Sequence, residues 1–204
     1  MFLLVITGGI GAGKSTAAEY FRQAGAFVID LDDVASRVLS PGSATLDAVA
    51  AAFGPDVLLA DGRLDRPALA RAAFASKATA QRLNALVHPA VTSELSRKLS
   101  ELRSARKAPA LVVVEVPLLA EAPAIADVAD VGLAIVAPQE VRVQRTVASG
   151  RAEPDARRRL AVQASDAERA ALADVVIVND GDRESFLARL DRFRREHVVL
   201  GGER

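Results

Sequence analysis

Residues 8–16, which read GGIGAGKST, combine glycines, a lysine and hydroxyl side chains at the spacing of a phosphate-binding loop. A glycine is followed by four residues and then by Gly13, Lys14 and Ser15, which is the pattern of this loop. Glycines let the backbone turn so that its N–H groups approach a phosphate, Lys14 can reach the β and γ phosphates, and the Ser15 hydroxyl can bind Mg²⁺. The sequence therefore predicts a nucleoside triphosphate site formed by Gly9, Ile10, Gly11, Ala12, Gly13, Lys14, Ser15 and Thr16.

The segments on either side of the glycine-rich loop support this interpretation. Residues 2–7 are all apolar or β-branched and predict a buried strand, and residues 16–24 predict a helix. Strand, loop and helix in this order are the context that the pattern requires. Such a helix directs the positive end of its dipole at the bound anion. The alternative is a glycine-rich turn that contains a lysine by chance.

Carboxylates follow or end two further predicted strands. Asp30 ends the second strand, and Asp32 and Asp33 come directly after it. Ligands of open α/β folds bind at the carboxyl ends of parallel strands, where a carboxylate can accept a proton from an attacking hydroxyl or hold Mg²⁺. The alternative is that these residues cap the next helix, and it is stronger for Asp33 than for Asp32. Glu115, near the end of the third strand, can lie near Mg²⁺ or form a salt bridge.

A basic segment lies late in the chain. Arg142 and Arg145 are three residues apart in a helix predicted over residues 139–148, and this spacing places them on one helix face. A second basic helix is predicted over residues 155–164. Two such helices joined by a glycine-containing turn suit a lid that closes over a polyphosphate, and a solvated basic surface is the alternative.

One histidine, His88, precedes Pro89 within a helical region. Its side chain can donate a hydrogen bond to a substrate phosphate or hydroxyl, or it can belong to the core and cap a helix. The spacing does not favour either role. Pro89 is expected to kink a helix or to begin a new one, with a long helix over residues 90–106.

The composition excludes several classes of protein. The 204 residues include 26 basic and 26 acidic side chains, and a net charge of zero argues against a general nucleic-acid binder. There is no cysteine, so disulfides and cysteine-based metal sites are excluded. No apolar run approaches the roughly 20 residues that span a bilayer, and the first apolar run is too short for a signal sequence. We therefore expect a cytoplasmic protein without a membrane partner.

Predicted strands begin near residues 2, 26, 110, 131 and 174, with helices between them. This alternation predicts an α/β fold with a five-stranded parallel sheet, the three-layer arrangement of phosphate-loop NTPases. The interval between the second and third strands is the longest and is helical, so we expect an inserted domain there. The predicted parts are a nucleotide-binding core (residues 1–32, 108–137 and 165–204), a helical substrate domain (33–107) and a lid (138–164).

The remaining sequence separates the classes of phosphate-loop proteins. GTPases read guanine with an Asn-Lys-x-Asp element, which the sequence lacks, and Asp61 is directly followed by Gly62 and so lacks the spacing of a GTPase switch. Motor ATPases usually have longer chains. An early helical insertion and a late arginine-rich hairpin are the layout of kinases that phosphorylate small molecules.

Several segments, taken together and in order, resemble the dephospho-coenzyme A kinases. They cover roughly residues 2–190, and the His-Pro and Pro-Leu-Leu-x-Glu elements are the most discriminating. The matching segments are the phosphate loop, Ile29-Asp-Leu-Asp32, Leu83-Asn-x-x-Val-His-Pro89, Pro117-Leu-Leu-x-Glu121, Gln163 and Ala173-Asp-x-x-Ile-x-Asn179-x-Gly181. The family usually has an arginine followed by aspartate or glycine in the lid, where this chain has Val147-Ala-Ser-Gly150.

The resemblance implies an enzyme that transfers the γ-phosphate of ATP, with Mg²⁺, to the ribose 3′-hydroxyl of dephospho-CoA. In this family Asp32 corresponds to the general base, Lys14 neutralises the γ-phosphate and Ser15 binds the metal. Arg145, together with Arg142 or Arg151, would stabilise the transition state. The resemblance places His88, Leu118 and Glu121 at the dephospho-CoA and Asn179 and Gly181 near adenine.

Two other functions compatible with the loop are another small-molecule or nucleoside monophosphate kinase, and a regulatory nucleotide-binding module without transfer activity. The combination of Lys14, Ser15 and Asp32 argues against the inactive module. Whether Asp30 or Glu115 helps to hold the metal stays open. The expected partner is a small-molecule substrate, and the expected assembly is a monomer or weak homo-oligomer.

Overall fold

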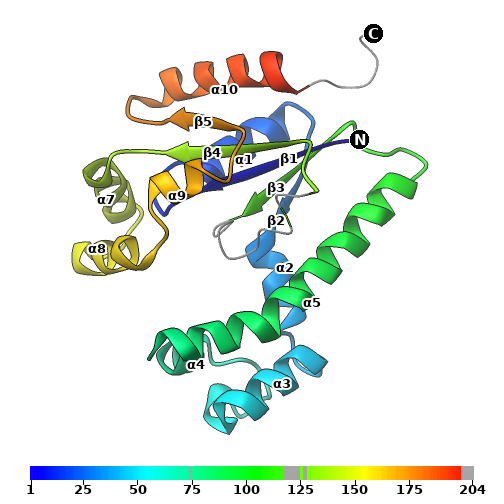
Figure 1. Cartoon of the computed structure of the whole chain (residues 1–204), viewed down its shortest axis with the longest axis vertical. Coiled ribbons are helices and arrows are strands. Elements are labelled where there is room, and N and C mark those ends of the chain that lie inside the picture. The colour runs from blue at the N-terminus through cyan, green and yellow to red at the C-terminus, as the bar shows by residue number, and fades with distance from the viewer. Residues whose placement is uncertain (74, 117–124, 126–127, 199–204) are drawn as a thin grey trace. The chain divides into compact units, whose positions relative to one another are not determined.

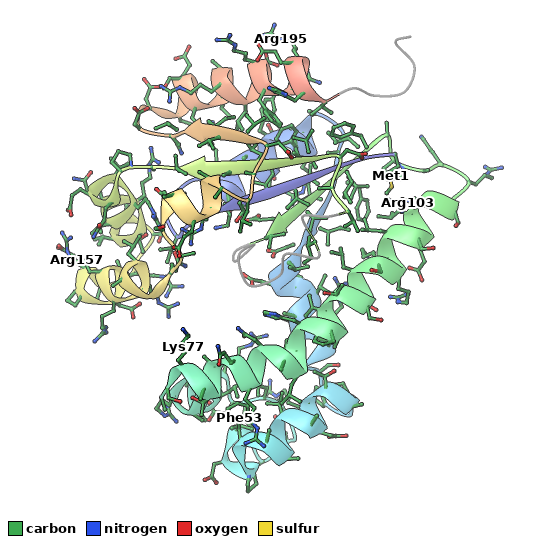
Figure 2. The ribbon with its side chains drawn as sticks, in the orientation of Figure 1. Met1, Phe53, Lys77, Arg103, Arg157 and Arg195 are labelled. Carbon is green, nitrogen blue, oxygen red and sulfur yellow. The ribbon has the colours of Figure 1, made fainter. Side chains whose placement is uncertain are left out.

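The structure of the protein is a computed structural model that describes residues 1–73, 75–116, 125 and 128–198 (Figure 1). The chain forms two compact units. The first comprises Met1–Asp30 and Leu102–Arg204, and the second comprises Leu31–Glu101. Figure 2 shows the side chains that these units carry.

The first unit is built on a parallel sheet. Within the described residues it has five strands in the order β2-β3-β1-β4-β5. The strands are β1 (Phe2–Gly8), β2 (Phe27–Asp30), β3 (Leu111–Val116), β4 (Val131–Val136) and β5 (Val175–Val178). The three central strands are almost wholly buried, because helices cover a parallel sheet and leave long apolar runs inside. Strand β1 lies between β3 and β4, and the strand order reverses at this point. Open α/β sheets bind their ligands at the carboxyl ends of the strands at such a point.

Helices of the first unit surround this sheet. They are α1 (Lys14–Gln23), α7 (Gln139–Ala148), α8 (Glu153–Val162), α9 (Asp166–Ala170) and α10 (Arg183–His197). Helix α8 packs on α7. Helices α1 and α10 share one core, in which the Phe21 and Phe193 rings meet edge to face at 6.3 Å. Figure 1 shows α10 lying along β5 at the edge of the sheet. Helix α9 contacts β1 and β4.

The second unit is helical. It contains α2 (Leu31–Val38), α3 (Ala44–Phe53), the short 3₁₀ helix η1 (Pro55–Val57), α4 (Arg66–Ala73) and most of α5 (Lys77–Ser104). Ser43 caps α3 by accepting a hydrogen bond from the Leu46 N–H. A separate small core forms around the buried side chains of Val49, Val57, Leu69 and Ala73.

The predicted α/β fold and its five strands are confirmed, each strand lying where the sequence indicates. The prediction of a separate helix over residues 90–106 is wrong, because α5 is one helix from Lys77 to Ser104 with Pro89 inside it. A proline removes one backbone hydrogen bond. The helix nevertheless continues, with Val91, Leu95 and Leu99 buried at a spacing of four residues along one face.

Within the described ranges, each helix is too short or too polar to cross a lipid bilayer.

Candidate nucleotide-binding site

The phosphate-binding loop connects the buried strand β1 to the first turn of α1. Gly11 and Gly13 have φ angles of 72° and 111°, the left-handed region that glycine adopts without strain. Gly13 is also the N-cap of α1 and has no side chain with which to satisfy the N–H groups of the first turn. These groups and the helix dipole make the end of the loop a binding site for an anion.

Lys14 and Ser15 follow the loop at the start of α1. The Lys14 ammonium donates to the Gly9 carbonyl at 3.4 Å, so the side chain folds back along the loop. The Ser15 hydroxyl donates to a carboxylate oxygen of Glu115 at 3.3 Å. Glu115 is paired with Asp30 in the β2–β3 register, so a second carboxylate lies on the neighbouring strand. Ser15 therefore contacts one of the two carboxylates that lie side by side near the carboxyl ends of β2 and β3.

Asn179 contacts the loop directly, and Arg145 supports Asn179. The buried Asn179 amide donates to the Ala12 carbonyl at 2.8 Å, and a Cβ on Gly13 would lie 2.4 Å from that amide nitrogen. The Arg145 guanidinium donates to both the backbone and side-chain oxygens of Asn179, at 3.1 and 3.3 Å, and to the Gly181 carbonyl at 3.1 Å. Arg145 thus fixes the turn at residues 179–181, where the resemblance places adenine.

Arg142 lies against the loop as a buried side chain. Its Nε donates to the Ile10 carbonyl at 3.0 Å, and a second nitrogen forms an ion pair with Asp166 at 3.1 Å. Burial lowers the pKa of this guanidinium, and Asp166 opposes that shift. The guanidinium stays charged because its ordinary pKa is so high. Sequence alone places Arg142 and Arg145 on one helix face. In the structure Arg142 contacts the phosphate loop, and Arg145 contacts the turn at residues 179–181.

One further charged residue near Arg142, Arg169, was not predicted from the sequence as a functional candidate. Arg169 is buried to 1% exposure, donates to the Ala164 carbonyl and lies 3.6 Å from Asp166. Burial, and secondarily the proximity of Arg142, lowers the pKa of Arg169. The Ser165-x-x-Glu168 capping box was an available signal for α9. No sequence pattern indicates that Arg169 itself is buried.

The remaining predicted residues lie elsewhere. Asp32 is exposed in the first turn of α2, directly after β2, and its carbonyl accepts from Ser36 at 2.8 Å. His88 is half-buried inside α5, so the idea that it caps a helix is wrong. Arg151 is exposed, 3.7 Å from Asp155. Leu118 and Glu121 lie outside the described residues.

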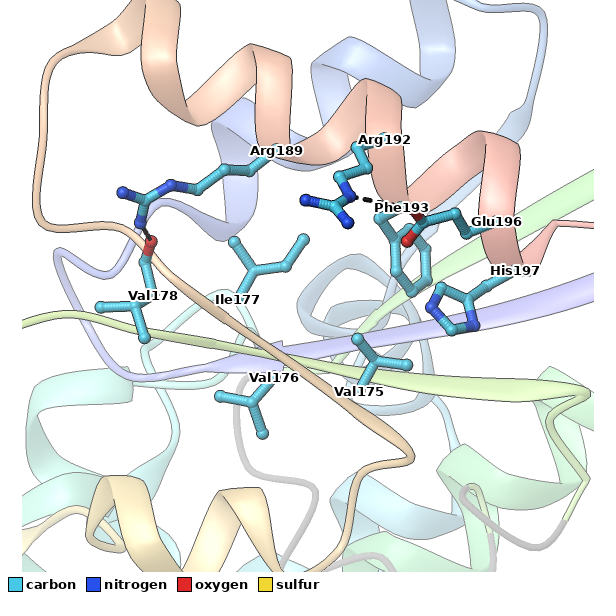
Figure 3. A pocket seen from close by; sticks show the side chains of 9 residues that line it. All are labelled: Val175, Val176, Ile177, Val178, Arg189, Arg192, Phe193, Glu196 and His197. Carbon is cyan, nitrogen blue, oxygen red and sulfur yellow. Dashed lines mark hydrogen bonds and ion pairs between the residues drawn. The ribbon is translucent and has the colours of Figure 1, made fainter.

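A groove between β5 and α10 contains none of the predicted site residues. Its volume is about 260 Å³, and its floor is apolar with arginines along α10 (Figure 3). The side chains that line it are Val175, Val176, Ile177, Val178, Arg189, Arg192, Phe193, Glu196 and His197. Arg189 donates to the Val178 carbonyl, which protects part of the sheet edge.

A parallel sheet with a glycine-rich loop at its switch point, followed by lysine and serine on a helix N-terminus, defines a phosphate-loop nucleotide-binding protein. Comparison with known proteins narrows this class. Residues 2–185 match the family model described as dephospho-CoA kinase. The chain belongs to the dephospho-CoA kinase family.

Individual relatives agree with this assignment. A dephospho-CoA kinase of Methylococcus capsulatus is 42% identical over 201 residues, which are 98% of each chain. One of Mycolicibacterium paratuberculosis is 42% identical over 200 residues, 98% of this chain and 48% of the relative. A solved structure from Thermus thermophilus has a TM-score of 0.78 and 34% identity, covering 96% of this chain and 97% of that one. The chain thus spans about half the length of the mycobacterial relatives that it matches.

Proposed function

We propose that this chain transfers the γ-phosphate of ATP to the ribose 3′-hydroxyl of dephospho-CoA, which completes coenzyme A. The observation that carries the proposal is the phosphate loop at the switch point of the sheet, in a chain that matches the dephospho-CoA kinase family over residues 2–185. Family membership supports dephospho-CoA as the acceptor, and the phosphate loop supports ATP as the donor.

On the donor side, backbone N–H groups of the loop and of the first turn of α1 would bind the α and β phosphates. The N–H groups of Ile10 and Ala12 are not among them, because they donate to Gln163 and to the Gly9 carbonyl. Lys14 would leave the Gly9 carbonyl, which it contacts at 3.4 Å, and neutralise charge on the transferring phosphoryl group. Asn179 and Gly181 would border adenine, because their turn is held against the loop through the Ala12 carbonyl. The nucleotide would then lie along a surface made entirely by the first unit.

The residues around Ser15 fit Mg²⁺. This ion takes hard oxygen ligands, usually one or two from the protein together with water and substrate phosphates. The Ser15 hydroxyl and the Glu115 carboxylate, 3.3 Å apart, provide such oxygens, and Asp30 lies beside Glu115 in the sheet register. When bound, Mg²⁺ would offset the negative charge of the β and γ phosphates.

On the acceptor side, we assign the proton-accepting role to Asp32. Its place in the chain supports this role, since it lies two residues beyond the carboxyl end of β2 and is exposed. The helical domain, residues 33–107 including His88, would bind dephospho-CoA, together with Leu118 and Glu121. Residues 138–164 would act as the lid.

Arg145 is the candidate for stabilising charge on the transferred phosphoryl group. Its guanidinium donates to the Asn179 and Gly181 carbonyls, so it would exchange one of these contacts for the phosphoryl group. Arg142 is a weaker candidate, because its charge is buried against the Ile10 carbonyl and Asp166. Arg151 is exposed beside Asp155 and could turn toward a bound nucleotide.

The test is a direct assay with the full chain, ATP, Mg²⁺ and dephospho-CoA, with coenzyme A identified by mass spectrometry. Shikimate and a panel of nucleoside monophosphates serve as competing acceptors, with ADP release as the common readout. Coenzyme A formation in preference to the other products supports the proposal. Nucleotide binding without any acceptor-dependent ADP release would instead identify a regulatory module, and preference for another acceptor would identify a different kinase.

A further inference from the structure

The peptide groups on both sides of Ile10, in the middle of the phosphate loop, are held from outside the loop. The Ile10 N–H donates to the Gln163 side-chain oxygen at 3.0 Å, and the Ile10 carbonyl accepts from Arg142 Nε at 3.0 Å. The same Gln163 oxygen accepts from a terminal nitrogen of Arg142 at 3.3 Å. These three hydrogen bonds form a closed ring. Gln163 binds the Ile10 N–H, Arg142 binds the Ile10 carbonyl, and Arg142 also binds Gln163.

The ring is supported by charge from α9. Asp166 pairs with Arg142 at 3.1 Å and approaches Arg169 at 3.6 Å, so one carboxylate faces two buried guanidinium groups. A buried ion pair is rigid because moving either partner leaves an uncompensated charge. Arg142 therefore has a fixed position from which to hold the loop.

The loop also rests directly on α7. A Cβ on Gly9 would lie 1.8 Å from a terminal nitrogen of Arg142, and a Cβ on Gly11 would lie 2.4 Å from the Arg142 carbonyl oxygen. A side chain at Gly11 would therefore meet the backbone of α7, and one at Gly9 would displace the Arg142 guanidinium. Glycines at this loop are usually explained by the approach of a phosphate, whereas here the protein behind the loop also requires them.

We propose that Gln163 and Arg142 are positioning residues that hold the Ile10 peptide, and hence the phosphate loop, in the shape that binds a polyphosphate. Gln163 directly follows α8 and precedes α9, so the same contact ties the predicted lid to the loop. The inference rests on the proposed function only in taking the loop as the site of the α and β phosphates. Preorganised amide donors bind an anion more tightly than donors that must be ordered on binding.

The variant Gln163→Met tests the proposal, because methionine has a similar length but cannot accept the Ile10 N–H. Gln163→Glu keeps an acceptor oxygen for both Ile10 and Arg142. Gln163 borders a cavity of about 330 Å³ between α7, α8 and α9, so its substitution does not empty a close-packed core. Gln144→Met is the matched control, since Gln144 is exposed on α7.

Calorimetric titration of each variant with ADP and with AMP provides a readout that does not depend on phosphoryl transfer. Gln163→Met should bind ADP about tenfold more weakly, the usual effect of leaving one backbone donor unpaired. It should lose less affinity for AMP, because AMP places only an α phosphate at the loop. Gln163→Glu and Gln144→Met should bind both nucleotides within about threefold of the unmodified protein. Equal weakening of ADP and AMP, or unchanged ADP binding by folded Gln163→Met, would overturn the proposal.

Amide hydrogen exchange of the unmodified protein keeps the proposal testable even if Gln163→Met does not fold. The Ile10 N–H should exchange slowly in the absence of nucleotide, since its acceptor is a protein side chain. Fast exchange at Ile10 would overturn the proposal. Failure of the proposed kinase activity would leave these results intact, because the calorimetric and exchange measurements require only a folded protein and a nucleotide.

Discussion

Gly9→Ala should lower both the stability of the protein and its affinity for ATP, although it adds only one methyl group at a φ that any residue can adopt. The added Cβ would lie 1.8 Å from a terminal nitrogen of Arg142 and 2.4 Å from its central carbon. The guanidinium must therefore move by at least about 1.6 Å to reach the 3.4 Å at which ordinary contact begins. Because Arg142 is bound to Ile10, Gln163 and Asp166, it cannot move by that amount without losing partners.

The cost follows from those partners. Hydrogen bonds to a charged group contribute about 1.5–3 kcal/mol each, and the displacement weakens at least the bonds to Gln163 and Asp166. We therefore expect a loss of about 3 kcal/mol in the free energy of unfolding of the first unit. For a chain of this size such a loss lowers the thermal midpoint by about 6–12 °C. Affinity for ATP should fall as well, because the loop moves with Arg142.

Thermal unfolding and ATP titration are the assays, and Gly132→Ala is the matched control. Gly132 is also buried and has no left-handed φ, but its added Cβ would meet Asp174 at an ordinary 3.4 Å. In an Arg142→Ala background, Gly9→Ala should lower the free energy of unfolding much less, since the clashing guanidinium is gone. If Gly9→Ala matches Gly132→Ala in both assays, Arg142 does not hold the position described here.

Three further predictions follow from the site. Asp32→Asn should lower turnover about a hundredfold or more and leave ATP affinity near normal, as expected for loss of a general base; near-normal turnover would make Asp32 a structural residue. Arg145→Lys keeps the charge but loses the fork that holds Asn179 and Gly181, so the KM for ATP should rise about tenfold, whereas a fall confined to kcat would place Arg145 on the transferred phosphoryl group. The Asp182 carboxylate caps α10, and hydrogen bonds from Ser185, chiefly its backbone N–H, hold its pKa below the ordinary 3.8. Its stabilising effect is present above pH 3.8 and is lost as the pH falls through the folded-state pKa. Asp182→Ala should therefore lower the thermal midpoint at pH 7, and by progressively less as the pH is lowered below 3.8.

The fold could be predicted because its strongest signals are local. Strand β1, the glycine loop and the start of α1 are contiguous, and each strand is an apolar run bounded by turn residues. The strand order could not be predicted, since the sequence does not say on which side of β1 each later strand pairs. Helix α5 was misjudged at Pro89, because the packing of its later turns outweighs the loss of one hydrogen bond.

The position of Lys14 and Ser15, at the start of a helix that follows a glycine-rich loop, could be predicted because the chemistry and the spacing of the residues coincide there. The predicted site was incomplete where a role depends on contacts between distant segments. Arginine is usually a surface residue, so a basic helix predicts side chains that face solvent or a bound ligand. The burial of Arg142 instead depends on its ion pair with Asp166, 24 positions away. Arg169 lies in a five-residue helix whose composition is that of an exposed turn. Only the three-dimensional arrangement reveals that these charges lie behind the phosphate loop.

The central claim is that the γ-phosphate held at this loop goes to one hydroxyl of one acceptor. The most direct test uses ATP labelled in its γ-phosphate, with dephospho-CoA and its 3′-deoxy analogue as paired acceptors. We predict that label appears on the 3′-oxygen of dephospho-CoA, that the deoxy analogue remains unlabelled, and that Lys14→Ala abolishes the transfer. Label on the deoxy analogue, or label found only in inorganic phosphate, would contradict this claim.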